Sequence, residues 1–353
     1  MSKKSIKNLV SKLFDDYKLI ETHTYRCKSL GYYNKKFNGL THVPIFCADS
    51  GFSINNIGIK NNSTKSSYVN VFPIGDNYII KYLKKNNNKK YNRELKGFIF
   101  NLLLYKYLNT NEKRDLLDYI CKVLQIGYIS ENNTIYCIMS KCGIDLRNFL
   151  NKNIDKIRLL SYFNKIIFLL NLIKQCAIAI KIIHDLGYVH LDIKLENFLI
   201  VMKDDNINDY QIKIIDFGLI SEKGIILKGK RGSKIYINKI MKNNIETKKE
   251  TEVRNFFDIY SLGIMFSVIT EFIFDKSNIL KNFRKNILET PSRENSFFNN
   301  THGINDNISR NILTIIDKMT TDKIQDRYNN IDYLIYDINN LLEVINELRQ
   351  NMY

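Results

Sequence analysis

The sequence predicts an α+β protein in which a small antiparallel β-rich part precedes a larger, mainly α-helical part. Short β-like runs dominate the chain before residue 145, and long stretches of helical periodicity dominate it afterwards. The 353 residues are 44% hydrophobic and 25% charged, which is typical of a globular chain and excludes wholesale disorder. A chain of this length has room for two domains or for one two-lobed unit.

The predicted elements of the first part are three strands and a helix. Tyr68–Phe72 and Tyr78–Leu83 are rich in β-branched and aromatic residues, and residues 73–77, which include proline, glycine and asparagine, form the turn between them. Asn92–Leu108 has apolar residues at spacings of three and four, which predicts a helix. Thr134–Met139 is the third strand candidate.

After residue 145 the predicted elements are four long helices and one hairpin. The helices are Ser161–Leu186, Phe256–Phe274, Ile308–Met319 and Ile331–Leu348. The hairpin joins Asn197–Met202 to Gln211–Ile215 through a polar turn. We therefore divide the chain into a basic N-terminal extension (residues 1–54), a β-rich lobe (55–142) and a helical lobe (143–353).

The composition of the chain indicates which kinds of partner it can bind and in which cellular compartment it is found. The 53 basic and 36 acidic residues give a net charge of +17, which favours acidic partners, nucleic acid or an anionic membrane; the alternative is that most lysines form a solvated surface. The apolar stretch Ile166–Ile183 contains four polar residues, so we expect a buried helix and no transmembrane segment. Lysines interrupt the first twenty residues, which therefore lack the apolar core of a secretory signal. The 6 cysteines include no C-x-x-C pair, which predicts a reducing intracellular compartment, cytoplasmic or nuclear.

The most informative segment is His190–Asn197, which reads HLDIKLEN. Asp216-Phe217-Gly218 follows the second strand of the predicted hairpin. Together these motifs resemble the eukaryotic-type serine/threonine protein kinase family, whose catalytic loop reads H-R-D-x-K-x-x-N and whose metal loop reads D-F-G. The resemblance implies a bilobal protein kinase-like fold, with a small antiparallel β lobe and a larger α-helical lobe. It also implies ATP and Mg²⁺ as cofactors and a protein hydroxyl as the phosphate acceptor.

The resemblance assigns a role to each polar residue of these motifs. Asp192 would orient the attacking hydroxyl and accept its proton, and Lys194 would neutralise charge on the transferred phosphoryl group. Asn197 and Asp216 would bind Mg²⁺, a hard cation that prefers oxygen ligands. Taken alone, Asp216 before a glycine is a turn-capping residue, and its combination with the catalytic-loop motif favours the metal role.

The resemblance also implies a nucleotide site in the β-rich lobe. Lys81, at the end of an apolar strand, would hold the α- and β-phosphates, and Glu94 would fix Lys81 through an ion pair. The alternative for Lys81 is a surface residue in a lysine-rich chain. Met139 would be the gatekeeper at the back of this site. The residues expected to contact or border the adenine are Val69, Ile79, Met139, Cys142 and Leu199.

The sequence departs from the family pattern in the groups that bind phosphate and regulate activity. Residues 62–69 contain no glycine where the family has its glycine-rich loop, so the backbone can approach phosphate less closely. Leu191 replaces the arginine of H-R-D, and switching by activation-loop phosphorylation through that residue is not expected. Ile240 stands in place of the glutamate of A-P-E, which leaves Glu246 or Glu250 as candidate partners of Arg327.

These departures leave two functional classes open. Lys81, Asp192 and Asp216 are all present, which favours a catalytic serine/threonine kinase with a protein substrate, and the basic composition favours an acidic one. The alternative is a pseudokinase scaffold or a basic module that binds nucleic acid or an acidic partner. Residues 139–146 resemble casein kinase 1 and vaccinia-related kinases, and residues 76–81 resemble the kinases of large DNA viruses, which would place the protein in a host cell.

Overall fold

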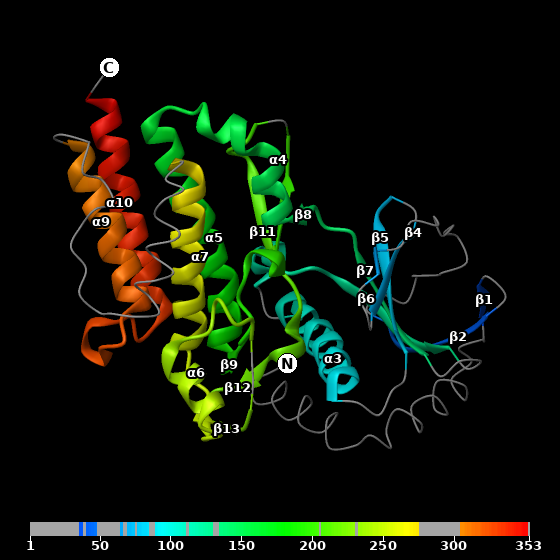
Figure 1. Ribbon diagram of the computed structural model, residues 1–353. Coiled ribbons are helices and arrows are strands. Elements are labelled where there is room, and N and C mark those ends of the chain that lie inside the picture. Colours follow the sequence, from blue (N-terminus) through cyan, green and yellow to red (C-terminus); the bar gives the residue numbers. More distant parts are fainter. Residues whose placement is uncertain are drawn as a thin grey trace. The chain divides into compact units, whose positions relative to one another are not determined.

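The computed structural model describes the chain in segments that fall into two compact units (Figure 1). The described segments are 35–37, 40–47, 64–65, 69–74, 76–84, 89–110, 113–129, 134–204, 206–229, 232–274 and 304–351. Unit 1 comprises Met1–Gly143 with Lys213–Leu219, and unit 2 comprises Ile144–Ile212 with Ile220–Tyr353. Each unit is described by itself.

Unit 1 is built on a seven-stranded antiparallel sheet with the order β1-β2-β6-β7-β5-β4-β3. Its strands are β1 (Lys35–Phe37), β2 (Leu40–Cys47), β3 (Thr64–Lys65), β4 (Val69–Ile74), β5 (Tyr78–Lys84), β6 (Val123–Ile129) and β7 (Thr134–Ser140). The three predicted strands are confirmed by β4, β5 and β7. Side chains from β5, β6 and β7 form the core of the sheet, with Ile80, Tyr136 and Ile138 all 0% exposed.

Two strands of this sheet come from the stretch that the sequence prediction assigned to an N-terminal extension. β1 pairs with β2, and β2 pairs with β6 in the middle of the chain. A register shift between Pro44 and Phe46 interrupts the β2–β6 ladder. Proline lacks the backbone N–H of a regular strand, which explains why this strand was hard to recognise from its sequence. The other residues of the predicted extension, 1–34, 38–39 and 48–54, lie outside the described part of the chain.

The long helix α3 (Lys89–Thr110), which lies in the described part of unit 1, confirms the helix predicted at Asn92–Leu108. Its apolar face packs on β5 and β6 (Figure 1). Leu95, Phe98 and Ile99 are among its buried residues. The short helix η2 (Arg114–Tyr119) follows it and leads into β6. The helix is therefore anchored to the sheet, and it also contacts residues 217–219, as described below.

Unit 2 is mainly α-helical. The helices among its described residues are α4 (Leu146–Arg158), α5 (Tyr162–Asp185), α6 (Lys239–Glu246), α7 (Phe256–Phe274), α9 (Ile304–Thr320) and α10 (Ile331–Gln350). The four predicted helices are confirmed by α5, α7, α9 and α10, which pack side by side (Figure 1). Asp145, Ser161 and Asn330 cap the N-termini of α4, α5 and α10 with side-chain hydrogen bonds.

Two helices of unit 2 are long and apolar enough, by length and composition alone, to cross a membrane. In α5 and α7, however, 67% and 83% of the most apolar window is buried inside the protein. Burial of this kind is typical of helices that are hydrophobic all round and lie in a protein core. The expectation that Ile166–Ile183 forms a buried helix is therefore confirmed.

Short strands connect the helices of unit 2. The predicted hairpin is confirmed by β10 (Phe198–Met202) and β11 (Tyr210–Ile214), and β10 also pairs with β8 (Ile144–Asp145). The segment after the hairpin forms two further antiparallel pairings. These are β12 (Ser221–Glu222) with β9 (Tyr188–Val189) and β13 (Ile226–Leu227) with β14 (Thr251–Glu252).

Candidate active site

Asp258, in the first turn of α7, holds the backbone of the loop that the sequence identified as catalytic. Its side chain is 1% exposed, and it accepts hydrogen bonds from the backbone nitrogens of His190 (2.7 Å) and Leu191 (2.8 Å). His184 Nε2 lies 2.9 Å from Asp258 Oδ2. Leu191 has φ of +65°, a left-handed conformation that costs about 1–3 kcal/mol for a non-glycine residue. The buried carboxylate therefore fixes a strained turn immediately before Asp192.

Asp192 is the centre of a hydrogen-bonded cluster. Lys194 Nζ lies 2.6 Å from Asp192 Oδ2, and Ser233 Oγ donates to Asp192 Oδ1 at 2.9 Å. Asn197 Nδ2 donates to the Asp192 carbonyl at 2.7 Å and to Oδ2 at 3.2 Å. Lys194 and Asn197, which the sequence assigned to catalysis and metal binding, thus both contact the predicted catalytic residue Asp192.

The environment of Asp192 favours its ionised form. Burial raises the pKa of Asp192, but the hydrogen bond and the charge of Lys194 act in the opposite direction, with smaller contributions from His190 and Ser233. The balance holds the pKa below its usual range. Asp192 is therefore a carboxylate at neutral pH, with one oxygen bonded to a cation and the other to a hydroxyl.

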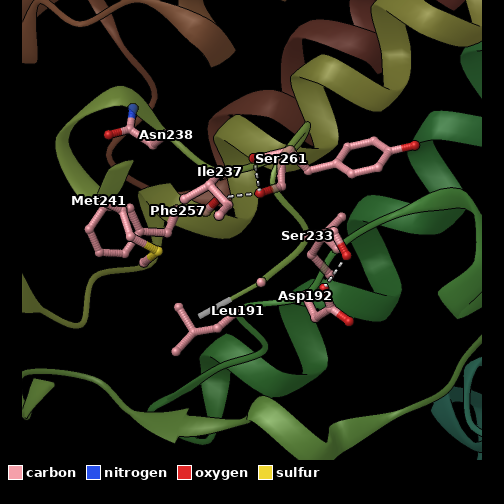
Figure 2. Close-up of a pocket in the computed structure, with 11 residues that line it drawn as sticks. Leu191, Asp192, Ser233, Ile237, Asn238, Met241, Phe257 and Ser261 are labelled. Carbon is pink, nitrogen blue, oxygen red and sulfur yellow. Dashed lines mark hydrogen bonds between the residues drawn. The ribbon is translucent and has the colours of Figure 1, made fainter. Parts of the chain in front are cut away.

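A small pocket opens beside this cluster (Figure 2). Its volume is about 10 Å³, close to that of a single water, and its lining combines apolar and hydroxyl side chains. The lining residues labelled in Figure 2 are Leu191, Asp192, Ser233, Ile237, Asn238, Met241, Phe257 and Ser261. Ser261 Oγ donates to the carbonyl oxygens of Tyr236 (2.8 Å) and Phe257 (2.9 Å), which ties the loop carrying Ser233 to α7.

Gly232 brings that loop against the catalytic loop. Its φ is +76°, and a Cβ at this position would lie 2.7 Å from the carbonyl oxygen of Leu191. Any other residue would be strained by the backbone conformation and would clash with a backbone atom. The close approach places Ser233 where its hydroxyl reaches Asp192.

In unit 1, Asp216, Phe217 and Gly218 pack against α3. The Phe217 ring is 2% exposed and lies 5.3 Å from the ring of Phe100. A Cβ at Gly97 would lie 2.8 Å from the Gly218 nitrogen and 2.9 Å from the Phe217 carbonyl carbon, so the helix backbone touches this segment directly. Asp216 has φ of +65°, and its Oδ1 accepts from Gly218 N at 3.3 Å.

The other predicted nucleotide residues of unit 1 lie on β4, β5, β7 and α3. Lys81 of β5 is opposite Cys137 of β7, and Ile79 is opposite Met139 in the same ladder. Lys81 and Glu94 are both partly buried, but the described interactions do not include an ion pair between them. The expected Lys81–Glu94 pair therefore stays a prediction.

The three remaining adenine candidates are placed in different ways. Cys142 follows β7 and is partly buried, and its Sγ lies 3.5 Å from the carbonyl oxygen of Ser140. Val69 opens β4, but its side chain lies outside the described part of the chain. Leu199 belongs to unit 2, where it pairs with Asp145. The predicted site residues thus form two groups, one within each unit.

Asn197 in unit 2 and Asp216 in unit 1 each carry an oxygen donor of the kind that a magnesium ion prefers. Asn197 uses its Nδ2 on the catalytic loop, which leaves Oδ1 as its ligand atom, and Asp216 offers a carboxylate. Among the described residues, no cluster of three or more His, Cys, Asp or Glu side chains could hold a metal ion on its own.

Sequence reasoning missed several residues around the catalytic loop. His184 contacts Asp258, and its signal was the rarity of histidine, combined with a position at the end of an apolar helix. Arg147 of α4 forms an ion pair with Glu196 of the catalytic loop, with Nη2 and Oε1 2.8 Å apart. No sequence signal identified this pair, because α4 itself was not predicted.

Arg327 lacks the partners that the sequence suggested for it. Glu250 pairs with Lys228, and neither Glu250 nor Glu246 bonds Arg327 among the described residues. The guanidinium instead lies over the ring of Phe256, with 3.7 Å between Cζ and the ring centroid. Stacking on an aromatic face takes the place of the expected ion pair.

Comparisons with known proteins agree with the arrangement of these motifs. The family described as "Protein kinase domain" matches residues 73–337. A probable serine/threonine-protein kinase of Dictyostelium discoideum is 29% identical over 253 residues, which cover 69% of this chain and 16% of that protein. The probable serine/threonine-protein kinase 2 of Plasmodium falciparum is 25% identical over 293 residues, or 81% of this chain and 50% of that protein.

A third relative, calcium-dependent protein kinase 22 of Arabidopsis thaliana, is 34% identical over 122 residues, or 33% of this chain and 22% of that protein. The chain therefore spans half or less of the length of these relatives. The family match covers most of the described residues in both units. The chain belongs to the protein kinase family, and its sheet-rich and helical units are the two lobes of that fold.

Proposed function

We propose that the protein is a serine/threonine kinase that transfers the γ-phosphate of Mg-ATP to a protein hydroxyl. The observation that carries this proposal is the arrangement around Asp192. One carboxylate oxygen already accepts a hydrogen bond from a serine hydroxyl at 2.9 Å, and the other is paired with Lys194 at 2.6 Å. A group that is ionised at neutral pH and accepts from a hydroxyl has the properties of the base in this reaction.

In this reaction the protein forms no covalent bond to the phosphoryl group. The acceptor hydroxyl forms a bond to the γ-phosphorus while the bond to the leaving ADP oxygen breaks, and Asp192 takes the hydroxyl proton. Lys194 compensates the negative charge on the transferred group. Because phosphoryl transfer passes through a loose transition state, positioning and charge compensation supply most of the rate enhancement. The strained turn at Leu191, fixed by Asp258, keeps Asp192 in position.

The metal and nucleotide roles follow from the same proposal. Asn197 and Asp216 would hold Mg²⁺, which would neutralise charge on the phosphate oxygens. Lys81 would hold the α- and β-phosphates and Glu94 would pair with it. The adenine would contact Val69, Ile79, Met139, Cys142 and Leu199.

A non-catalytic scaffold, or a basic module that binds nucleic acid, is the alternative. It is favoured by residues 62–69, which lack the glycines that let a backbone approach phosphate. Against it, the chain retains a lysine on β5, the Asp192 cluster and Asp216. We further propose a reducing compartment, cytoplasmic or nuclear, as the place of action.

The direct test is transfer of labelled phosphate from ATP to casein and to the protein itself, with and without Mg²⁺, followed by identification of the labelled amino acid. We expect phosphoserine or phosphothreonine only when Mg²⁺ is present. Absence of transfer, together with no thermal stabilisation by millimolar Mg-ATP, would contradict the proposal. Retention on DNA that falls steeply with salt would then support the binding module.

A further inference from the structure

Both carboxylates of the catalytic loop are neutralised by the chain itself. Residues 190–197 contain only Asp192 and Glu196 as acidic residues. Lys194 pairs with Asp192, and Arg147 pairs with Glu196 at 2.8 Å. The second oxygen of Glu196 is buried. A basic side chain of a bound peptide therefore finds no free carboxylate on this loop.

Tyr236, which lines the pocket, also contacts Arg147 of the Arg147–Glu196 pair. Its ring is 6% exposed, and its hydroxyl is hydrogen-bonded to Arg147 and to the backbone of Leu195. Burial raises the pKa of Tyr236, with a smaller contribution from the charge of Glu196. Tyr236 therefore links α4 and the catalytic loop to the loop that carries Ser233.

The loop that carries Ser233 adds uncompensated positive charge. Lys234 directly follows the serine that bonds Asp192, and Lys239 opens α6, whose cap residue Asn238 lines the pocket. Both lysines are exposed, and neither has an ion-pair partner among the described residues. Residues 232–249 contain five lysines and a single acidic residue, Glu246. The surface next to Asp192 is therefore cationic.

We infer that this surface selects acidic sequences around the phosphoacceptor residue and disfavours basic ones. The inference rests on the proposed kinase function and specifies its substrate class. The exposed cations Lys234 and Lys239 attract an acidic peptide and repel a basic one. Each exposed charge contact contributes a factor of about two to five, so contacts with the two lysines together change the specificity by about tenfold.

The test compares three peptides of equal length that carry one central serine and differ only in flanking acidic, neutral or basic residues. We expect kcat/KM to be about tenfold higher for the acidic than for the basic peptide, mainly through KM. This ratio should shrink as NaCl rises from about 0.05 to about 0.5 M, because the contacts are exposed to solvent.

Two sets of variants assign the effect to the named residues. Lys234→Gln with Lys239→Gln should remove most of the preference, while the matched pair Lys152→Gln with Lys156→Gln, which removes two exposed charges from α4, should leave it unchanged. Arg147→Gln frees Glu196 and should raise kcat/KM for the basic peptide about threefold. Adding Glu196→Gln to Arg147→Gln should abolish that gain.

The outcomes separate this inference from the proposed function. Equal phosphorylation of all three peptides, or a preference that the matched α4 variant loses equally, would overturn the acidic specificity while the kinase proposal stands. A preference that survives replacement of both Lys234 and Lys239 would overturn the assignment to this surface. Absence of Mg²⁺-dependent transfer to any peptide, casein or the protein itself would contradict the kinase proposal.

Discussion

The hydroxyl of Ser233 donates a hydrogen bond of 2.9 Å to the carboxylate of Asp192, although 41 positions separate the two residues in the sequence. The loop of Ser233 is attached to α7 through Ser261, and the left-handed Gly232 lets it approach Leu191 closely. The loop and the catalytic aspartate are thus connected by contacts that require no phosphate group. This connection bears directly on regulation.

Activity should not depend on phosphorylation of the segment between residues 219 and 237. β12 pairs with β9 and β13 pairs with β14, and the side chains of Lys228 and Glu250 lie 3.0 Å apart, so strand pairing and an ion pair already hold the described part of this segment. Leu191 replaces the arginine of H-R-D, so the catalytic loop offers no cation at that position to pair with a phosphate on this segment. Phosphatase-treated protein should keep its activity on casein. A drop of about tenfold that is reversed by rephosphorylation within this segment would contradict the prediction.

Gly97→Ala should destabilise the protein. Alanine in place of glycine normally stabilises a helix interior by about 0.5–1 kcal/mol. Here the new Cβ would lie within 2.9 Å of backbone atoms of Phe217 and Gly218, and we expect a net loss of about 1–3 kcal/mol in the free energy of unfolding, measured in urea. Asn109→Ala, at an exposed position of α3, is the control and should be neutral or stabilising. A stabilising Gly97→Ala would refute the contact between α3 and residues 217–218.

Asp216→Ala should weaken nucleotide binding in the presence of Mg²⁺ far more than binding without metal. The proposed role of Asp216 is to hold the metal, so its removal affects the metal-dependent part of the affinity. Titration of ATP with and without Mg²⁺, followed by calorimetry, measures both. Equal losses under the two conditions would mean that Asp216 only shapes the turn to Gly218.

Cys142 should be the most reactive of the four cysteines whose side chains the structure describes, which are Cys121, Cys137, Cys142 and Cys176. A hydrogen bond from Cys121 lowers the pKa of Cys142, burial opposes this, and the charge of Lys213 lowers it further. Burial raises the pKa of Cys137 to about 12. Since the thiolate is the nucleophile, limited iodoacetamide at neutral pH should label Cys142 before Cys121, Cys137 or Cys176, as read by peptide mass spectrometry.

Nucleotide provides the control for that measurement. Because Cys142 is proposed to lie next to the adenine, Mg-ATP should slow its alkylation, and Cys142→Ser should remove the fast phase. Faster labelling of buried Cys137 than of Cys142 would contradict the described packing of β7. Labelling of Cys142 that is indifferent to Mg-ATP would contradict its place in the nucleotide site.

Local patterns in the sequence predicted those elements whose apolar residues repeat regularly. Phe256–Phe274 is a long apolar run that is buried on nearly all sides, Tyr78–Leu83 is rich in β-branched and aromatic residues, and the structure confirms both elements. α4 could have been predicted, because its four buried residues, Leu146, Phe149, Leu150 and Ile157, recur at the spacings of one helical face. β6 was missed because it is buried along most of its length and contains Gly127, whose lack of a side chain leaves room for the Tyr136 ring.

The catalytic group could be predicted because its residues are close in the sequence. Asp192, Lys194 and Asn197 occupy one loop, so their spacing alone brought them together. The contacts of Arg147 with Glu196 and of His184 with Asp258 depend on how α4, α5 and α7 pack, which no local pattern encodes. The side chain that stacks on Arg327 was unpredictable for the same reason.

Asp192→Asn gives the most direct test of the central claim. The asparagine keeps the size of the side chain and can still accept from Ser233, so the melting temperature should stay within a few degrees of wild type. It cannot take a proton, so Mg²⁺-dependent transfer of labelled phosphate to serine should fall by about 10²–10⁴-fold. Measured on folded protein, such a loss is the predicted result, and transfer by Asp192→Asn at the wild-type rate would contradict the assignment of Asp192 as the base.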